Sequence, residues 1–258
     1  MSHYPPPDAK RVVILAPHPD DETLGCGGTI ALYTSNAVEV YLLILSDGGG
    51  ISVDLTDKDK DIDITSVRKQ ESLAAASLLG IKHTLFLGFP TRKLEEYKDE
   101  IKKKVEDIVR EFEPEIIFAP SPVDFHQDHI TTAHMALWLK SRFLPLKIAF
   151  YEIYNTIRFN TLVDITEVMH VKEKAMLNYH YSLLGRPEIF SNAIKALNSY
   201  RSFYTQEMGY YEAYWMISEP KEHNEIIEWL TFGMKNEHPF GLLKRAKRFY
   251  KSFLRKSI

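Results

Sequence analysis

The feature that most constrains the fold is a short apolar run, Val12-Val13-Ile14-Leu15, which stops at the polar segment Ala16-Pro17-His18-Pro19-Asp20-Asp21-Glu22. Such a run, bounded by turn-forming residues, is typical of a strand buried on both faces of a parallel sheet. A second apolar run, 115–119, ends in the same way before Asp124-Phe125-His126-Gln127-Asp128-His129. Because α/β proteins bind ligands at the carboxyl ends of such strands, we expect both polar segments to contribute to a functional site.

Strand-like and helix-like segments alternate through the first two thirds of the chain. Strands are predicted near residues 11–16, 38–46, 82–87, 115–119 and 147–152, and helices near 22–35, 64–80, 94–112 and 128–140. This alternation favours an α/β fold, with a mostly parallel, Rossmann-like sheet and helices on both of its faces.

From Asp164 onward the pattern changes to a mainly helical C-terminal extension. Helices are predicted over 168–184 and 187–203, and a stretch rich in aromatic residues follows them. A chain of 258 residues can bury a substantial core in one domain. We therefore expect a single domain, with a core at about 10–165 and a C-terminal subdomain at about 166–258.

Three side chains in the polar segments have the types and spacing of a metal site. His18 and Asp21 are three residues apart after the first apolar run, and His129 follows the second. Two imidazoles and one carboxylate leave room for water, as in catalytic zinc sites. The same donors also suit non-haem Fe²⁺, so Zn²⁺ is expected, with Fe²⁺ or another divalent metal as the alternative.

Two further residues of these segments are suited to proton transfer and charge stabilisation. Asp20 neighbours a ligand, and both a cation and a helix N-terminus favour its ionised form, so it can accept a proton from water. His126 lies three residues before His129, so the loop or the first helical turn could bring it near the ion without making it a ligand. If Asp128 holds His126 cationic, this imidazole can meet a developing oxyanion.

Both segments closely resemble the motifs of the LmbE-like or PIG-L family of metal-dependent N-acetylglucosaminyl deacetylases. The matching residues are Pro17-His18-Pro19-Asp20-Asp21-Glu22, Gly25-Cys26-Gly27-Gly28 and His126-Gln127-Asp128-His129. The resemblance covers about residues 10–150, and Arg68-Lys-Gln-Glu71 resembles the arginine and glutamate that open the family's second long helix. On this basis, the chain is expected to form an LmbE-like domain.

The resemblance implies a role for each matching position. His18, Asp21 and His129 correspond to the zinc ligands and Asp20 to the general base. His126 corresponds to the histidine that stabilises the oxyanion or protonates the leaving amine, and Asp128 to the carboxylate paired with that histidine. Arg68 falls where family members contact the sugar or its aglycone.

The implied activity is a zinc-dependent hydrolysis that removes the N-acetyl group from a GlcNAc-type amino sugar conjugate by metal-activated water. Two alternatives remain at this point: a metallohydrolase acting on another amide or ester, and a non-catalytic, metal-dependent sugar-binding protein. The presence of both Asp20 and His126 favours catalysis. An aspartate before a helix is often only an N-cap, but two such motifs at two strand ends favour a site.

Composition indicates the class of partner and the location. The formal net charge of −3 argues against nucleic-acid binding and leaves a small-molecule amino sugar conjugate as the expected partner. Residues 1–8 lack a basic and apolar signal sequence, and no apolar run approaches the ~20 residues that span a bilayer. A cytoplasmic location is therefore expected.

The tail, residues 242–258, is predicted to form a basic amphipathic helix. Leu242, Leu243, Ala246, Phe249, Tyr250, Phe253 and Leu254 recur at helical spacing between lysines and arginines. Such a helix suits an anionic membrane surface, or docking on the domain or on a partner subunit of a homo-oligomer.

Overall fold

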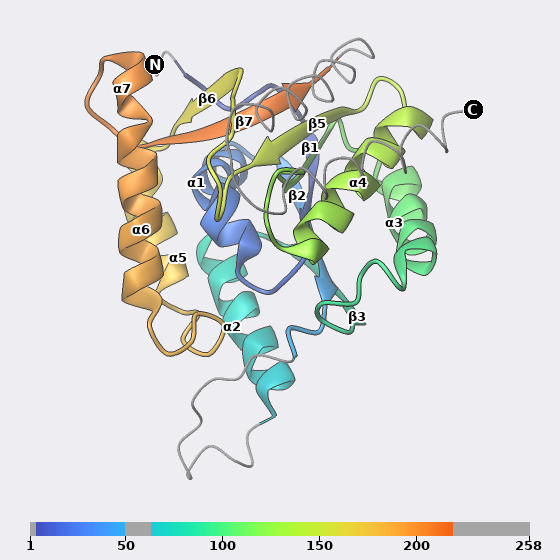
Figure 1. The fold of residues 1–258 in the computed structure, drawn as a ribbon. Coiled ribbons are helices and arrows are strands. Elements are labelled where there is room, and N and C mark those ends of the chain that lie inside the picture. Colours follow the sequence, from blue (N-terminus) through green and yellow to red (C-terminus); the bar gives the residue numbers. More distant parts are fainter. Residues whose placement is uncertain (1–3, 50–62, 219–258) are drawn as a thin grey trace, which may run out of the picture. The chain divides into compact units, whose positions relative to one another are not determined.

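A computed structural model describes residues 4–49 and 63–218, and its central feature is a seven-stranded sheet (Figure 1). The strands are β1 (Arg11–Ala16), β2 (Glu39–Ser46), β3 (His83–Phe89), β4 (Ile116–Pro120), β5 (Lys147–Tyr151), β6 (Thr161–Asp164) and β7 (Tyr211–Ile217). They lie in the order β3-β2-β1-β4-β5-β7-β6, with β3 to β5 joined by parallel pairs and β6 antiparallel to β7. The predicted mostly parallel α/β fold is confirmed.

Helices lie on both sides of this sheet. They are α1 (Asp21–Ser35), α2 (Ile64–Leu78), α3 (Lys98–Phe112), α4 (Gln127–Arg142), α5 (Met169–Met176), α6 (Pro187–Tyr200) and α7 (Ser202–Thr205), with a 3₁₀ turn at Thr166–Val168. Helix α5 contacts α1, α2 and α6 on one side, and α3 packs against α4 on the other (Figure 1).

The strand order explains where a site can form. Strand β1 pairs with β2 along one edge and with β4 along the other. The chain therefore adds β2 and β3 on one side of β1 and the later strands on the opposite side. Residues Val12 to Ala16 are fully buried, as expected for a central parallel strand. A crevice opens where the strand order changes sides in this way, outside the carboxyl ends of the strands. The loops after β1 and β4 meet there, and they carry the two polar segments.

Strands β6 and β7 were not predicted. Strand β7 lies between β5 and β6 and is buried along its whole length. Its sequence places Glu212 among aromatic residues, so it lacks the continuous apolar pattern of β1. Lys172 on α5 forms an ion pair with the buried Glu212, which makes the carboxylate tolerable inside the sheet.

The C-terminal extension is mainly helical, with two differences from the sequence prediction. The helix expected over 168–184 ends at Met176, and residues 177–186 form a folded connection to α6. Strand β7 extends the sheet beyond residue 165. The chain divides into compact units at residues 1–216 and 217–258, and the predicted single-domain organisation stays a prediction.

The glycines after Asp21 allow α1 to approach the sheet closely. A methyl group at Gly25 would lie 2.2 Å from Cδ2 of Tyr151, and one at Gly28 would lie 2.6 Å from Ile165. Helix α1 is also kinked at Cys26. Just after the kink, the backbone N–H groups of Gly28 and Thr29 donate hydrogen bonds to the Glu212 carboxylate.

Gly25→Ala is therefore expected to destabilise the protein by about 1–3 kcal/mol, because the methyl group would overlap a ring that has no room to move. The matched control is Gly27→Ala, where the nearest atom lies 3.2 Å away on the flexible Lys172 side chain. Urea denaturation measures both. Equal stability of the two variants would contradict the packing argument.

Among the described residues, no helix is both long and apolar enough to cross a membrane. The predicted basic helix at 242–258 lies outside the described residues. Its contact with a membrane or a partner subunit stays a prediction, as does a cytoplasmic location.

Candidate active site

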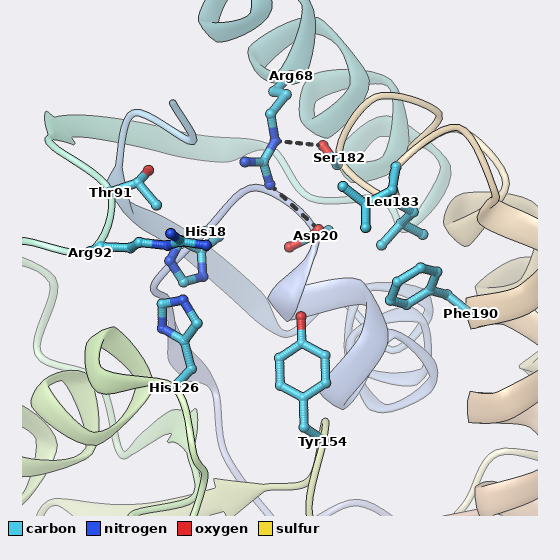
Figure 2. Close-up of a pocket in the computed structure, with 11 residues that line it drawn as sticks. His18, Asp20, Arg68, Thr91, Arg92, His126, Tyr154, Ser182, Leu183 and Phe190 are labelled. Atoms are coloured by element: carbon cyan, nitrogen blue, oxygen red, sulfur yellow. Dashed lines mark hydrogen bonds and ion pairs between the residues drawn. The ribbon is translucent and has the colours of Figure 1, made fainter. Parts of the chain in front are cut away.

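A pocket of about 310 Å³ opens at the crevice between β1 and β4 (Figure 2). It is lined by residues from seven parts of the chain: His18, Asp20, Arg68, Thr91, Arg92, His126, Tyr154, Ser182, Leu183, Leu184 and Phe190. Two of the three predicted catalytic side chains, Asp20 and His126, border this space, as does Arg68, whereas Asp128 is not part of the lining. The structure thus brings together residues from loops about a hundred positions apart in the sequence.

The predicted metal ligands lie close together beside the pocket, and His18 is part of its lining. His18 Nδ1 lies 3.0 Å from Asp21 Oδ2 and 3.3 Å from His129 Nε2, and the last two atoms are 3.2 Å apart. Ligand atoms around one ion with bonds of about 2.1 Å are separated by about 3.0–3.4 Å in tetrahedral or octahedral geometry. Asp21 Oδ1 is also buried without a hydrogen-bond partner. The three residues therefore fit a divalent cation.

His126 also lies close to this cluster. One nitrogen from each of His18, His126 and His129 falls within 4.8 Å of the others. The spacing of His18, Asp21 and His129 is tighter and matches a coordination shell more closely, so we retain Asp21 as the third ligand.

Two carboxylates fix the orientation of the histidine ligands. Asp128 Oδ2 lies 3.0 Å from His18 Nε2, and Asp124 Oδ2 lies 3.2 Å from His129 Nδ1. With a carboxylate beside the outer nitrogen of each ring, the proton is favoured on that nitrogen, and the inner nitrogen keeps its lone pair for a metal. Asp124 belongs to the second polar segment, but the sequence analysis assigns it no role. Its position five residues before His129 was the available signal.

The predicted pairing of Asp128 with His126 is wrong. Besides His18, the Asp128 carboxylate accepts hydrogen bonds from the backbone N–H groups of Arg92, at 2.6 Å, and Leu94, at 3.2 Å. Asp128 lies in the first turn of α4, and its side chain faces the segment after β3. Sequence spacing cannot show that direction.

Asp128→Asn is expected to weaken metal binding by about 10-fold to 100-fold, because it removes the charge that orients His18. Competition with a chelating dye measures this affinity. Unchanged affinity together with a lower kcat would instead support a role of Asp128 through His126.

The charges around the cluster favour a cation. Burial opposes ionisation of both His129 and Asp21, but their mutual attraction prevails. The carboxylates of Asp21 and Asp124 raise the pKa of His129 to about 10. Conversely, His129 and His18 hold the pKa of Asp21 well below its usual range. Together with Asp128, three carboxylates thus surround two imidazoles, an arrangement that a divalent cation would neutralise.

Asp20 is held in an unusual backbone conformation beside the cluster. Its φ of 137° is rare for a residue other than glycine, and its side chain makes no helix-capping hydrogen bond. The residue is 5% exposed, and Oδ2 of its carboxylate lies 3.5 Å from Nη2 of Arg68. Burial, followed by the charge of Asp21, raises the pKa of Asp20 well above its usual range despite Arg68. The structure therefore disfavours the N-cap interpretation and leaves a carboxylate facing the pocket.

His126 is set up as a neutral hydrogen-bond donor, not as the expected cation. The backbone N–H of Asp128 donates to His126 Nδ1 at 3.2 Å, so the neutral ring carries its proton on Nε2. Burial and the nearby charges of His18 and His129 lower the pKa of His126 to about 4.

Arg68 serves mainly to hold other parts of the site. Its guanidinium donates to the carbonyls of Gly48, at 2.5 Å, and Pro19, at 3.1 Å, and to Ser182 Oγ at 2.9 Å. One turn later on α2, Glu71 accepts hydrogen bonds from the backbone and hydroxyl of Ser182. The Arg68-Lys-Gln-Glu71 signature thus fastens the loop of Asp20 to the 177–186 connection. Direct substrate binding by Arg68 stays a prediction.

Known proteins share both the motifs and the fold. The family model described as PIG-L, GlcNAc-PI de-N-acetylase, matches residues 13–139. Diacetylchitobiose deacetylase of Thermococcus kodakarensis is 30% identical over 187 residues, which are 66% of this chain and 68% of that protein. A probable N-acetyl-alpha-D-glucosaminyl L-malate deacetylase 2 of Bacillus cereus is 34% identical over 123 residues, 46% of this chain and 56% of the relative.

A solved structure gives the same picture. N,N'-diacetylchitobiose deacetylase from Pyrococcus horikoshii, complexed with its inhibitor MPG, superimposes with a TM-score of 0.70 at 27% sequence identity. The match covers 82% of this chain and 85% of that one. The similarity thus extends beyond the residues matched by the family model.

Proposed function

Because the chain belongs to the PIG-L family of deacetylases, we propose that it removes the N-acetyl group from a GlcNAc-type amino sugar conjugate by zinc-dependent hydrolysis. One observation carries this proposal: the donor atoms of His18, Asp21 and His129 cluster within 3.3 Å of one another, and Asp20 faces the same pocket. A metal site beside a buried carboxylate is well suited to hydrolysis of an unactivated amide, because the metal activates water and the carboxylate accepts its proton.

His18, Asp21 and His129 would hold the metal. A divalent ion bound there lowers the pKa of water and polarises a carbonyl group. The donor set also suits Fe²⁺, so Zn²⁺ is the proposed ion and not the sole chemical possibility.

The residues of the chain divide the remaining chemistry between them. Asp20 accepts a proton from the water whose oxygen attacks the acetyl carbonyl carbon. His126 donates its Nε2–H to the carbonyl oxygen as negative charge develops there. When the C–N bond breaks, the proton held by Asp20 passes to the leaving nitrogen, and the products are acetate and the free amino sugar.

The substrate class rests on the relatives. Two of them are named for compounds containing N-acetylglucosamine, one a disaccharide and one a malate conjugate. We propose a small-molecule conjugate of that kind as the substrate of this chain.

A screen of the metal-loaded protein against N-acetylated amino sugars tests the proposal. The panel contains diacetylchitobiose, a malate glycoside of N-acetylglucosamine, and simple amides and esters, with release of free amine or acid as the readout. Amine release from the sugar conjugates supports the proposal. Turnover of simple amides or esters alone would favour another metallohydrolase, and sugar binding without turnover would favour a binding protein.

A further inference from the structure

Arg92 lines the pocket, and no other residue in the described part of the chain pairs with its guanidinium. Two arginines line the pocket, and Arg68 is buried and hydrogen-bonded to carbonyl and hydroxyl oxygens. Arg92 is exposed and, like His18, lines the pocket (Figure 2). Within residues 4–49 and 63–218, its side chain forms no hydrogen bond or ion pair.

The backbone of Arg92 is nevertheless held firmly in place. Its N–H donates to Asp128 Oδ2 at 2.6 Å, the same oxygen that lies 3.0 Å from His18 Nε2. The preceding residue, Thr91, donates to Asp47 through both its N–H and its hydroxyl. The backbone of Arg92, from which the side chain extends, is therefore held at a fixed position relative to the proposed metal ligand His18.

The conformation at this point is unfavourable for an arginine. Arg92 has a φ of 66°, in the left-handed region that glycine adopts without strain. For other residues this region costs about 1–2 kcal/mol. Strain of this kind is concentrated at functional sites, which favours a ligand-binding role for this side chain.

The nearby carboxylates are already engaged elsewhere. Asp20 lies against Arg68, and Asp128 is bound to His18 and two backbone N–H groups. Asp47 accepts hydrogen bonds from Gly49 and Thr91. Among residues 4–49 and 63–218, no carboxylate therefore neutralises the positive charge at the pocket rim, and a ligand can do so.

We propose that Arg92 binds an oxyanion on the substrate and makes acidic amino sugar conjugates the preferred substrates. A guanidinium binds carboxylate or phosphate through two parallel hydrogen bonds, so both groups share the required chemistry. The inference rests on the proposed deacetylation and specifies which conjugates the site selects.

Three N-acetylglucosaminides test the inference: the 1-phosphate, a carboxymethyl glycoside and the neutral methyl glycoside. The readout is the ratio of kcat/KM for each acidic compound to that for the methyl glycoside. We expect a ratio on the order of 10 at low salt for at least one acidic compound, decreasing as salt screens the charge. The compound with the larger ratio identifies phosphate or carboxylate as the preferred group.

Variants then assign the preference to Arg92. Arg92→Gln should bring the ratio close to one, and Arg92→Glu should bring it below one. Lys93→Gln is the matched control, because Lys93 is exposed, adjacent and outside the pocket lining. Its ratio should equal that of the unmodified protein. Metal content is measured in every sample, since an anion can also bind a metal directly.

Calorimetric binding to the Asp20→Asn protein separates recognition from turnover. We expect the acidic compound to bind more tightly than the methyl glycoside, and this difference to disappear when Arg92→Gln is added. That result supports the inference even if no substrate is deacetylated. Absence of deacetylation would refute only the proposed function. A ratio near one for both acidic compounds would overturn the inference. So would an acidic preference that survives Arg92→Gln.

Discussion

Asp20→Asn is expected to lower kcat by on the order of 10²–10⁴, while the metal content stays near that of the unmodified protein. The substitution keeps the shape of the side chain but removes the proton acceptor. Asp20 contributes no atom to the tight cluster of His18, Asp21 and His129, so binding of the ion should survive. Steady-state amine release, combined with metal analysis of the same samples, measures both effects.

The outcome distinguishes the roles of the two adjacent aspartates. Asp21→Asn is the matched comparison, because it makes the same chemical change one residue away, at a proposed ligand. Metal loss that accompanies the activity loss in Asp20→Asn would show that base and ligand have been assigned the wrong way round. Near-normal turnover of the metal-loaded Asp20→Asn protein would remove Asp20 from the mechanism.

His129→Ala is expected to lose both the metal and the activity. It removes one of three ligands, so the affinity should fall by more than the 10-fold to 100-fold typical of outer-sphere partners. Activity at limiting metal concentration should fall by on the order of 10³ or more. Metal analysis after gel filtration and amine release measure the two effects.

The matched control is His134→Ala, the same substitution on the same helix. His134 lies farther along α4 and does not line the pocket. The metal content of this variant should match that of the unmodified protein. Full metal occupancy in His129→Ala would contradict the assignment and would favour His126 as the second imidazole ligand.

The position of the site could be predicted because it follows from simple rules of parallel sheets. The apolar run before His18 and the run before His126 each form a buried strand, β1 and β4. These strands are neighbours, with Val12 opposite Ile116, so their carboxyl ends converge. Residue type and spacing were then enough to place the three candidate ligands together.

The connections within the site could not be predicted, because they depend on side-chain direction. Asp128 faces His18 and the backbone of Arg92 and Leu94, although His126 is closer in sequence. Likewise, no local pattern predicts the φ of 137° at Asp20 or the hydrogen bond from Arg68 on α2 to the carbonyl of Pro19.

The missed strand β7 illustrates a different limit. Glu212 interrupts an aromatic run that would otherwise indicate a buried strand. Its charge is offset by Lys172, forty residues earlier, and by the N–H groups of Gly28 and Thr29 at the kink in α1. A local pattern cannot reveal partners that tertiary packing supplies.

The most direct test of the central claim is amine release from an N-acetylglucosaminide by one preparation in three states: as purified, stripped of metal by a chelator, and reconstituted with Zn²⁺. The account predicts that activity disappears on stripping and returns in proportion to metal bound, up to about one ion per chain. Fe²⁺ in place of Zn²⁺ identifies the more effective ion. Full activity in protein shown by elemental analysis to be free of metal would contradict the account.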